Sequence, residues 1–141
     1  MGELLKGKNI LIMGVRNKWS IAWGIAMAAK SQGANLIFTY LGDREKEALL
    51  KLTCDMGNIT AYPCDVSKEE DIDLVFNEIR QKFGVLHGLV HAIAYARAED
   101  LQDTFVNTSK DGFLLAMDIS VYSFIAVTNR ARELMTEGGS I

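Results

Sequence analysis

The sequence predicts an α/β fold built on a doubly wound parallel sheet, and two observations lead to it. Short apolar runs alternate with helical patterns along all 141 residues, and such alternation specifies parallel strands joined by right-handed crossovers. A glycine turn at Gly14 separates the first apolar run from the first helical pattern, an arrangement typical of βαβ units that bind a nucleotide diphosphate. We therefore expect a Rossmann-type strand order of 3-2-1-4-5, truncated at the start of strand 5.

Length and composition fit one domain and exclude several classes of function. The chain is 49% apolar, long enough for a real core, and has a net charge of −3. An acidic chain without a basic stripe argues against nucleic-acid binding. Apolar runs are broken within about ten residues and no secretory signal pattern follows the first residues. We expect a cytoplasmic protein that neither spans nor binds a membrane.

The first strand and helix form the candidate phosphate site. The strand at residues 10–13 ends at Gly14, and glycine takes up any backbone angle there without penalty. Ser20 begins the helix as a favoured N-cap residue, and its hydroxyl can serve either the helix or a bound anion. Unpaired amides and the positive dipole end at this helix start stabilise a pyrophosphate. The alternative is an ordinary strand-turn-helix unit whose small residues serve only packing.

The rest of the chain continues the alternation. Ser67 and Glu70 have the spacing of a capping box, and Ser140–Ile141 resemble the first residues of a fifth strand. The patterns predict a helix from Ser20 to Gly33, strands at 35–40, 59–64 and 86–96, helices at 43–56, 67–83 and 109–135, and a polar loop at 97–107.

Ligands of such sheets bind beyond the carboxyl ends of the strands, at the switch point between strands 1 and 4. Asp65 could accept a hydrogen bond from an adenine amino group, and the small side chains of Ala92, Ala94 and Ala96 leave room for a flat ligand. The strand ends expected at this edge are Gly14, Tyr40–Leu41, Asp65–Val66 and Ala92–Ala96.

Other reactive residue types lack a catalytic or metal-binding pattern. Cys54 and Cys64 are ten residues apart and form no C-x-x-C motif, so we interpret both as free, half-buried thiols. We interpret His87 and His91 as buried structural histidines, because no acid or nucleophile is paired with them in sequence. The acidic residues at 69–73 complement a helix dipole. We therefore predict no metal site.

Several motifs in combination resemble one family, the bacterial enoyl-acyl-carrier-protein reductases of type II fatty-acid synthesis, which are divergent short-chain dehydrogenases. The first glycine motif of that family is G-x5-S-x-A-x-G-x-A. The resemblance covers essentially the whole chain. It rests on Gly14-Val15, the run from Ser20 to Ala26, Phe38-Thr39-Tyr40, Cys64-Asp65-Val66, the run from His91 to Ala94, and Asp118-Ile119-Ser120.

The resemblance implies roles for particular residues. The pyrophosphate would be held by Gly14 with Ser20 and Ile21. The adenine ring would be held by Asp65 and Val66. Ile93 and Ala94 would contact the ribose and nicotinamide side, Ala96 would border the acyl-substrate pocket, and Leu41 would lie near the adenosine ribose.

Leu41 departs from the family pattern, in which a glutamine or a basic residue occupies that position, and this leaves the choice of cofactor open. A 2′-phosphate needs a cation near the end of strand 2, whereas a free 2′-hydroxyl suits an acid. Asp43 would repel the phosphate and Arg44 would attract it. We favour NADH over NADPH.

In the family, two tyrosines and a lysine that follow strand 5 carry out the chemistry, so we predict no catalytic residue in this chain. Residues 1–141 are expected to be the amino-terminal part of a single dinucleotide-binding domain, with the carboxyl-terminal catalytic part absent. The resemblance implies NADH-dependent reduction of the 2,3 double bond of trans-2-enoyl-acyl-carrier-protein thioesters. It also implies a homotetramer that uses the helix from Ser109.

Two alternatives stay open at this stage. If 141 residues are the complete product, the chain is a non-catalytic nucleotide-binding or oligomer-forming module. A flavodoxin-like binder is disfavoured, because the spacing of Gly14 and Ser20 suits a pyrophosphate better than a single phosphate.

Overall fold

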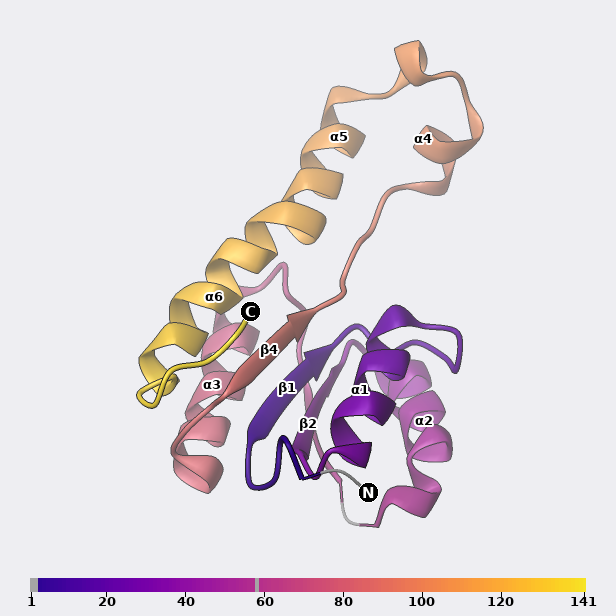
Figure 1. Cartoon of the computed structure of the whole chain (residues 1–141). Helices are drawn as coiled ribbons and strands as arrows, with labels where there is room; N and C mark the ends of the chain where they lie inside the picture. The colour runs from indigo at the N-terminus through magenta and orange to yellow at the C-terminus, as the bar shows by residue number, and fades with distance from the viewer. Residues whose placement is uncertain (1–2, 58) are drawn as a thin grey trace.

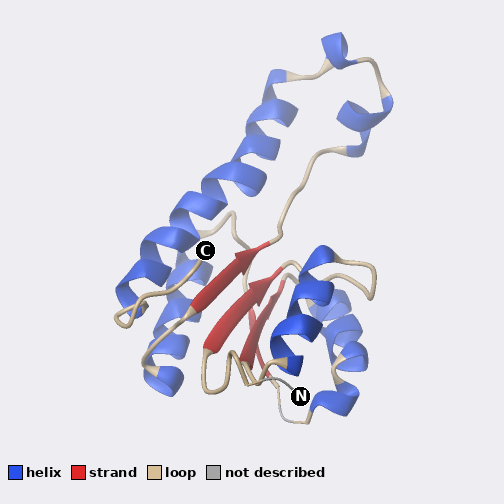
Figure 2. Cartoon of the chain, in the orientation of Figure 1, coloured by secondary structure: helices blue, strands red, loops and turns tan. Residues whose placement is uncertain are grey.

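A computed structural model of the chain describes residues 3–57 and 59–141. Its centre is a parallel sheet whose order, β3-β2-β1-β4, confirms the predicted doubly wound arrangement (Figure 2). The strand order reverses between β1 and β4, which makes that junction the switch point. The strands are β1 (Asn9–Met13), β2 (Asn35–Tyr40), β3 (Thr60–Pro63) and β4 (Gly88–His91).

Helices cover both faces of the sheet, with α1 and α2 on one face and α3 and α6 on the other (Figure 1). The segment from α4 to α5, which we call the arm, extends beyond the carboxyl end of the sheet (Figure 1). The helices are α1 (Ile21–Ser31), α2 (Asp43–Leu52), α3 (Glu69–Phe83), α4 (Ala98–Gln102), α5 (Lys110–Met117) and α6 (Ser123–Leu134), with short 3-10 turns η1 (Cys54–Met56) and η2 (Phe105–Asn107) and a π-helical turn η3 (Asp118–Tyr122).

Strand β1 is buried on both faces, which explains its uninterrupted apolar run. Ile10 and Ile12 pack into the cluster under α1 and α2. Leu11 and Met13 pack into the cluster under α3 and α6. Successive side chains of a strand point to opposite faces, so one five-residue strand contributes to both cores and fixes both helical layers.

Helix α1 lies against the sheet through its alanines. Ala22 and Ala26 are fully buried and Ala29 nearly so, and methyl-sized side chains let the helix backbone come close to β1 and β2. Gly24 points away from the sheet, since a Cβ added there would have nothing within 4 Å. The small-residue face predicted from the sequence therefore consists of alanines.

Strand β4 is shorter than the predicted strand at 86–96. Its last register partner is Met13, opposite His91, and one further bond joins the Ala92 N–H to the Met13 carbonyl at 3.0 Å. Strand β1 ends there, so the apolar residues that follow Ala92 have no neighbouring strand in the described sheet. They continue as an extended segment toward the arm (Figure 1).

The predicted helix at 43–56 ends early. The side chain of Thr53 is buried and its hydroxyl donates to the Leu49 carbonyl at 2.8 Å. The same carbonyl accepts the Thr53 N–H at 3.0 Å, so Thr53 is the C-cap residue of the helix. Helix α2 ends at Leu52 and the 3-10 turn η1 follows.

The predicted capping box at Ser67 and Glu70 does not form. Helix α3 begins at Glu69, with Lys68 as its N-cap residue and no side-chain cap. The Ser67 hydroxyl instead donates to Asp65 Oδ1 at 2.6 Å. Ser67 therefore belongs to the turn after β3. The acidic residues in the first turn of α3 complement the helix dipole.

The polar loop predicted at 97–107 contains two short elements, α4 and η2. The carboxylate of Asp100 ties α4 to the next helix, because its Oδ1 accepts from the Ser109 N–H at 3.2 Å. Ser109 Oγ in turn accepts from the Gly112 N–H at 3.0 Å and caps α5. The predicted helix start at Ser109 is confirmed.

Helices α5 and α6 form one continuous helix, Lys110–Leu134, joined by the π-helical turn η3. By length and composition this helix could cross a membrane, contrary to the expectation from the broken apolar runs. This is weak support for a membrane span, since core helices pass the same test. Its inner face belongs to the core, where Val127 and Ala131 are fully buried.

The start of a fifth strand lies beside β4. Ser140 forms an isolated parallel bridge with Gly88. Leu89 N–H donates to the Ser140 carbonyl at 3.0 Å, and Ser140 N–H donates to the His87 carbonyl at 3.2 Å. This pairing agrees with the predicted order, in which strand 5 follows strand 4.

Gly14 is the position where we expect the fold to be least tolerant. It has φ +100°, and a Cβ added there would lie 2.1 Å from the Ala92 carbonyl oxygen. We expect Gly14→Ala to lower the free energy of unfolding by more than about 3 kcal/mol, because backbone strain and a backbone clash add. Urea unfolding followed by circular dichroism measures this.

Gly24→Ala is the matched control. Nothing lies within 4 Å of an added Cβ, so we expect it to raise stability by about 0.5–1 kcal/mol through helix propensity. A loss of less than about 1 kcal/mol in the free energy of unfolding of Gly14→Ala would contradict the close contact between Gly14 and the backbone after β4.

Candidate functional site

The fold brings the predicted site residues to the carboxyl edge of the sheet. The ends of β1 and β4 are joined by the bond from Ala92 N–H to the Met13 carbonyl. The ends of β2 and β3 are joined by a bond from Cys64 N–H to the Tyr40 carbonyl at 2.8 Å. The residues that follow these four strands therefore share one edge, and they include Gly14, Leu41, Asp65, Val66, Ile93, Ala94 and Ala96.

Ser20 braces the turn between β1 and α1. It is the N-cap residue of α1, but its side chain does not cap the helix. Its Oγ accepts the backbone N–H groups of Arg16 at 2.9 Å and Asn17 at 3.0 Å. Because the oxygen is occupied as an acceptor, the hydroxyl proton is left to donate to an anion in front of the turn.

The start of α1 offers further donors. The amides of Trp23 and Gly24 bond to the Ser20 carbonyl at 3.0 and 3.2 Å. Among the residues that the structure describes, the amides of Ile21 and Ala22 have no acceptor. Free amides at the positive end of a helix dipole are the donors that a phosphate group uses.

Asp65 is held in place as an ionised acceptor. Its N–H donates to Asp71 Oδ2 at 2.9 Å, and its Oδ1 accepts the N–H and the hydroxyl of Ser67. The hydrogen bond from the Ser67 side chain, with further help from the nearby Lys68, lowers the pKa of Asp65 below its ordinary value. Oδ2 lies 3.8 Å from Lys68 Nζ, and the Asp65 side chain remains 30% exposed, so the carboxylate keeps acceptor capacity for an amino group of a ligand.

The segment after β4 forms the other half of the edge. Val66 and Ile93 are half-buried and pack against the core cluster under α3 and α6. Ala94 is exposed and Ala96 is half-buried. Small side chains beside the switch point leave the backbone accessible to a flat group.

The end of β2 is exposed and carries charges of both signs. The side chain of Leu41 is 64% exposed, and Gly42 is the N-cap residue of α2. Asp43 and Arg44 follow in the first turn of α2, and both are exposed. A ligand group near Leu41 therefore meets a carboxylate and a guanidinium whose effects on a phosphate oppose each other.

The surroundings of the histidines and cysteines give them no catalytic arrangement among the described residues. The Asn9 N–H donates to His87 Nδ1 at 3.1 Å, which leaves the Nε2–H to donate to Glu137 at 3.1 Å. Burial lowers the pKa of His91, whose ring is therefore neutral near pH 7. Burial also raises the pKa of Cys64 to about 12, so it is a poor nucleophile, and Cys54 is an exposed free thiol.

Glu69, Asp71 and Asp73 of α3 have partners within the chain. Arg130 bonds to Glu69 at 2.6 Å and to Asp73 at 2.9 Å, and Asp71 supports Asp65. Within residues 3–57 and 59–141, no group of histidine, cysteine or acidic side chains has a metal-binding arrangement.

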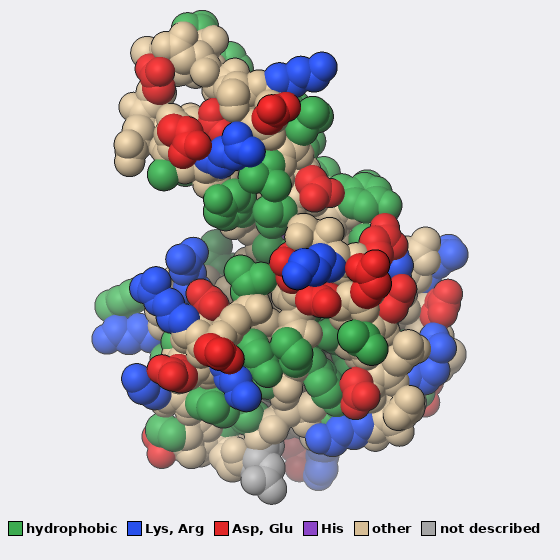
Figure 3. Space-filling view, turned by 180° about the vertical axis from the view of Figure 1, so that it is seen from behind, with side chains coloured by type: hydrophobic (Ala, Val, Ile, Leu, Met, Phe, Trp, Pro, Cys, Tyr) green, Lys and Arg blue, Asp and Glu red, His purple; other side chains and the backbone are tan. Residues whose placement is uncertain are grey.

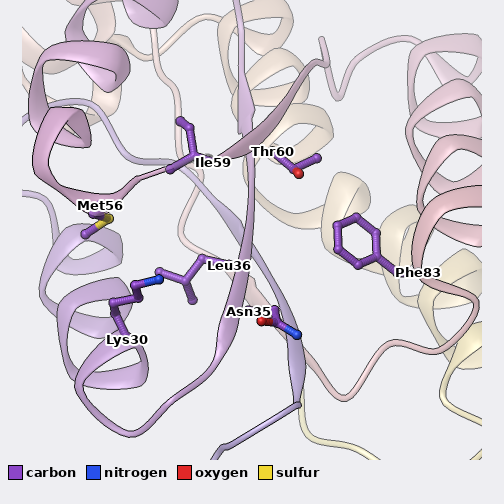
Figure 4. A pocket seen from close by; sticks show the side chains of 7 residues that line it. All are labelled: Lys30, Asn35, Leu36, Met56, Ile59, Thr60 and Phe83. Carbon is purple, nitrogen blue, oxygen red and sulfur yellow. The ribbon is translucent and has the colours of Figure 1, made fainter. Parts of the chain in front are cut away.

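A small hollow of about 150 Å³ lies at the opposite, amino-terminal edge of the sheet. Lys30 and Met56 lie on one side of it and Phe83 on the other (Figure 4). Asn35 and Thr60, which begin β2 and β3, lie between them. This hollow contains none of the predicted site residues, so the carboxyl edge is the candidate site.

Sequence reasoning missed the side chains that hold the edge from behind. Asp71 and Ser67 fix Asp65, and Ser120 bonds to the backbone of Tyr95. Only Ser120 had a sequence signal, because it belongs to the Asp118-Ile119-Ser120 motif. The other two follow from the turn geometry after β3.

Comparison with known proteins gives one consistent family. The family model described as Enoyl-(Acyl carrier protein) reductase matches residues 14–141. A curated relative, the enoyl-[acyl-carrier-protein] reductase [NADH] FabI of Bacillus subtilis, is 49% identical over an alignment of 143 positions that covers 100% of this chain and 55% of the relative. The chain thus spans about half the length of the curated relatives it matches.

Two further matches carry different cofactor names. The enoyl-[acyl-carrier-protein] reductase [NADPH] FabI of Staphylococcus aureus is 43% identical over 139 residues, 97% of this chain and 54% of the relative. The crystal structure of the Bacillus cereus enoyl-acyl carrier protein reductase with NADP+ and indole naphthyridinone has 45% identity and a TM-score of 0.93. The match covers 99% of this chain and 55% of the Bacillus cereus chain.

The hydrogen bond between Ser67 and Asp65 can be tested by titration. We expect Ser67→Ala to raise the pKa of Asp65 toward its ordinary value of about 4, because the largest cause of the lowered pKa is removed. A carboxylate whose pKa is lowered by folding stabilises the fold at pH values above its ordinary pKa. This contribution is lost as the pH falls through the pKa of the folded state. The stability difference between the variant and the wild type should therefore vanish in acid.

Carboxyl-carbon NMR titration of Asp65 measures this shift. Ser31→Ala is the control, since that hydroxyl donates only to the Ala28 carbonyl on the surface of α1. An unchanged Asp65 titration in Ser67→Ala would rule out the described turn.

Proposed function

We propose, from the premise that this chain belongs to the enoyl-(acyl carrier protein) reductase family, that it is the cofactor-binding part of such an enzyme. The proposed reaction is NADH-dependent reduction of the 2,3 double bond of a trans-2-enoyl-acyl-carrier-protein thioester. The observation that carries the proposal is the convergence of the four strand ends at one edge, where free amides and a fixed carboxylate face outward.

The phosphate end of the cofactor fits the start of α1. Ser20 has a free hydroxyl proton and the amides of Ile21 and Ala22 have no acceptor in the described chain. Gly14 keeps the turn clear of a side chain. These groups supply donors for a pyrophosphate without a lysine.

The two ends of the cofactor fit the strand ends on either side. Asp65 would accept the adenine amino group while Val66 lies against the ring. Ile93 and Ala94 would contact the ribose and nicotinamide, and Ala96 would border the acyl substrate. Bound there, a reduced nicotinamide supplies hydride to the substrate, and the chain's own residues bind and orient it.

We propose that residues 1–141 form the amino-terminal part of one dinucleotide-binding domain. The matched relatives continue beyond the region that this chain covers. The catalytic tyrosines and lysine expected for the family are assigned to that further region. In this chain we assign no residue to the acid that protonates the enolate.

NADH is the proposed cofactor, and the charges beside Leu41 support it. Asp43 opposes a 2′-phosphate at the amino end of α2, although Arg44 attracts one. The relatives are named for both cofactors. The preference therefore depends on the balance of these two side chains.

An acyl-carrier-protein-bound enoyl substrate and further copies of the protein are the proposed partners, in a cytoplasmic homotetramer. Apolar side chains gather where the arm joins the body (Figure 3). A tetramer contact through α5 and α6 would remove them from water, with a favourable free energy proportional to the buried apolar area. The exposed apolar residues of this helix are Phe113, Leu114, Met117, Val121, Tyr122, Phe124 and Ile125.

The first test is a titration with NADH, followed by nicotinamide fluorescence. We expect the wild type to bind, and we expect Asp65→Ala to raise the Kd about fivefold, the effect of losing one hydrogen bond of about 1 kcal/mol. Asp55→Ala is the control, because Asp55 is exposed in η1, away from the edge. Absence of NADH binding by the intact protein would refute the proposed function.

The cofactor preference gives a second test. We expect the wild type to bind NADH more tightly than NADPH. Asp43→Ala should lower the Kd for NADPH about threefold and Arg44→Ala should raise it by a similar factor, as expected of exposed charges near a phosphate. The Kd for NADH should stay within about twofold in both variants. Tighter binding of NADPH by the wild type would reverse the assignment.

A further inference from the structure

The segment that leaves β4 is held by a side chain rather than by a strand. The Tyr95 N–H donates to Ser120 Oγ at 3.0 Å, and the Ser120 hydroxyl donates to the Tyr95 carbonyl at 3.2 Å. One hydroxyl thus satisfies both backbone groups of Tyr95. Tyr95 itself is 49% exposed, so its backbone gains little from burial and depends on this pair of bonds.

Ser120 lies in the π-helical turn η3, which interrupts the long helix Lys110–Leu134. Turns of this kind occur frequently at functional sites. The Ser123 N–H bonds to the Asp118 carbonyl, five residues back, and the Ser123 hydroxyl donates to the Ile119 carbonyl at 2.6 Å. The carbonyls of Asp118 and Ile119 are thereby satisfied.

A second tie is made by Ser123, the first residue of α6, directly after the turn. Because the Ser123 hydroxyl proton is used by Ile119, its Oγ accepts from His91 Nε2 at 2.8 Å. Ser123 is fully buried, and the His91 ring packs edge-on against Phe124 with 5.4 Å between ring centroids. The end of β4 is therefore fixed at His91 and again at Tyr95.

The two ties bracket the residues assigned to the nicotinamide side. Ala92, Ile93 and Ala94 lie between His91 and Tyr95, and Ala96 follows directly. A shift of the Tyr95 backbone would move Ala96 first, because the His91 tie and the β1 pairing hold the other end. The Ser120 tie thus acts on the substrate side of the segment.

We propose that Ser120 is a positioning residue, whose hydroxyl holds the Tyr95 backbone so that Ala96 defines the border of the enoyl-substrate pocket. This inference rests on the proposed function and deepens it. Ser120 acts through the backbone that it holds and is assigned no contact with the reacting atoms. The alternative is that the bond only stabilises the packing of α6.

Amide hydrogen exchange at Tyr95 in the intact native protein tests the tie directly. We expect Ser120→Ala to speed exchange of this amide about fivefold, the factor that matches loss of one hydrogen bond. Ser120→Thr keeps the oxygen and should restore slow exchange. Ser31→Ala, on the surface of α1, should leave it unchanged. Unchanged exchange at Tyr95 in Ser120→Ala would overturn the proposal.

Steady-state kinetics separate positioning from stability. In the intact enzyme, including the catalytic part that follows this region, we expect Ser120→Ala to raise the KM for an enoyl thioester about fivefold while the Kd for NADH stays within about twofold, with Ser120→Thr close to the wild type. An unchanged KM, or equal losses for NADH and the thioester, would overturn the positioning role. An intact wild-type enzyme that binds NADH and does not reduce the thioester would refute the proposed function instead, and the exchange result would still show whether the tie exists.

Discussion

The carboxyl edge of the sheet depends on how closely the turn after β1 lies against the backbone that follows β4. At Gly14 there is no room for a side chain, because the Ala92 carbonyl oxygen occupies the place of a Cβ. That contact joins the two strands on either side of the switch point. It brings the donors at the start of α1 next to the segment that begins at Ala92, so that one ligand can reach both.

This approach is possible because β1 is covered on both faces. Ile12 faces the alanines of α1 and Met13 faces the cluster under α3 and α6. The small side chains of α1 bring the helix start close to the end of β1, where its free amides meet the turn braced by Ser20. The packing of α1 against β1 therefore also places the phosphate donors.

A second layer of polar side chains fixes the edge from behind. Asp71 holds the backbone of Asp65, Ser123 holds the ring of His91, and Ser120 holds the backbone of Tyr95. Each acts on a residue at or just beyond the end of a strand. Asp71 and Ser120 bond to backbone groups that follow the last ladder hydrogen bond, and Ser123 holds a side chain at the last register pair of β4. The π-helical turn in the long helix supplies Ser120, and the first residue of α6 directly after the turn supplies Ser123.

The sequence by itself determined the strand order, most elements and the edge at which the site residues lie, because apolar periodicity, glycine turns and parallel crossovers are local or topological rules. It also pointed to Asp65 and Ser20 through their place after a strand and before a helix. Only the tertiary structure decided where β4 stops, because that depends on the length of its neighbour β1. The tertiary structure also decided that Ser67 serves Asp65 rather than a helix cap, and that Ser120 reaches Tyr95. Contacts between residues 25 apart depend on how helices settle on the sheet, and no periodicity along the chain encodes them.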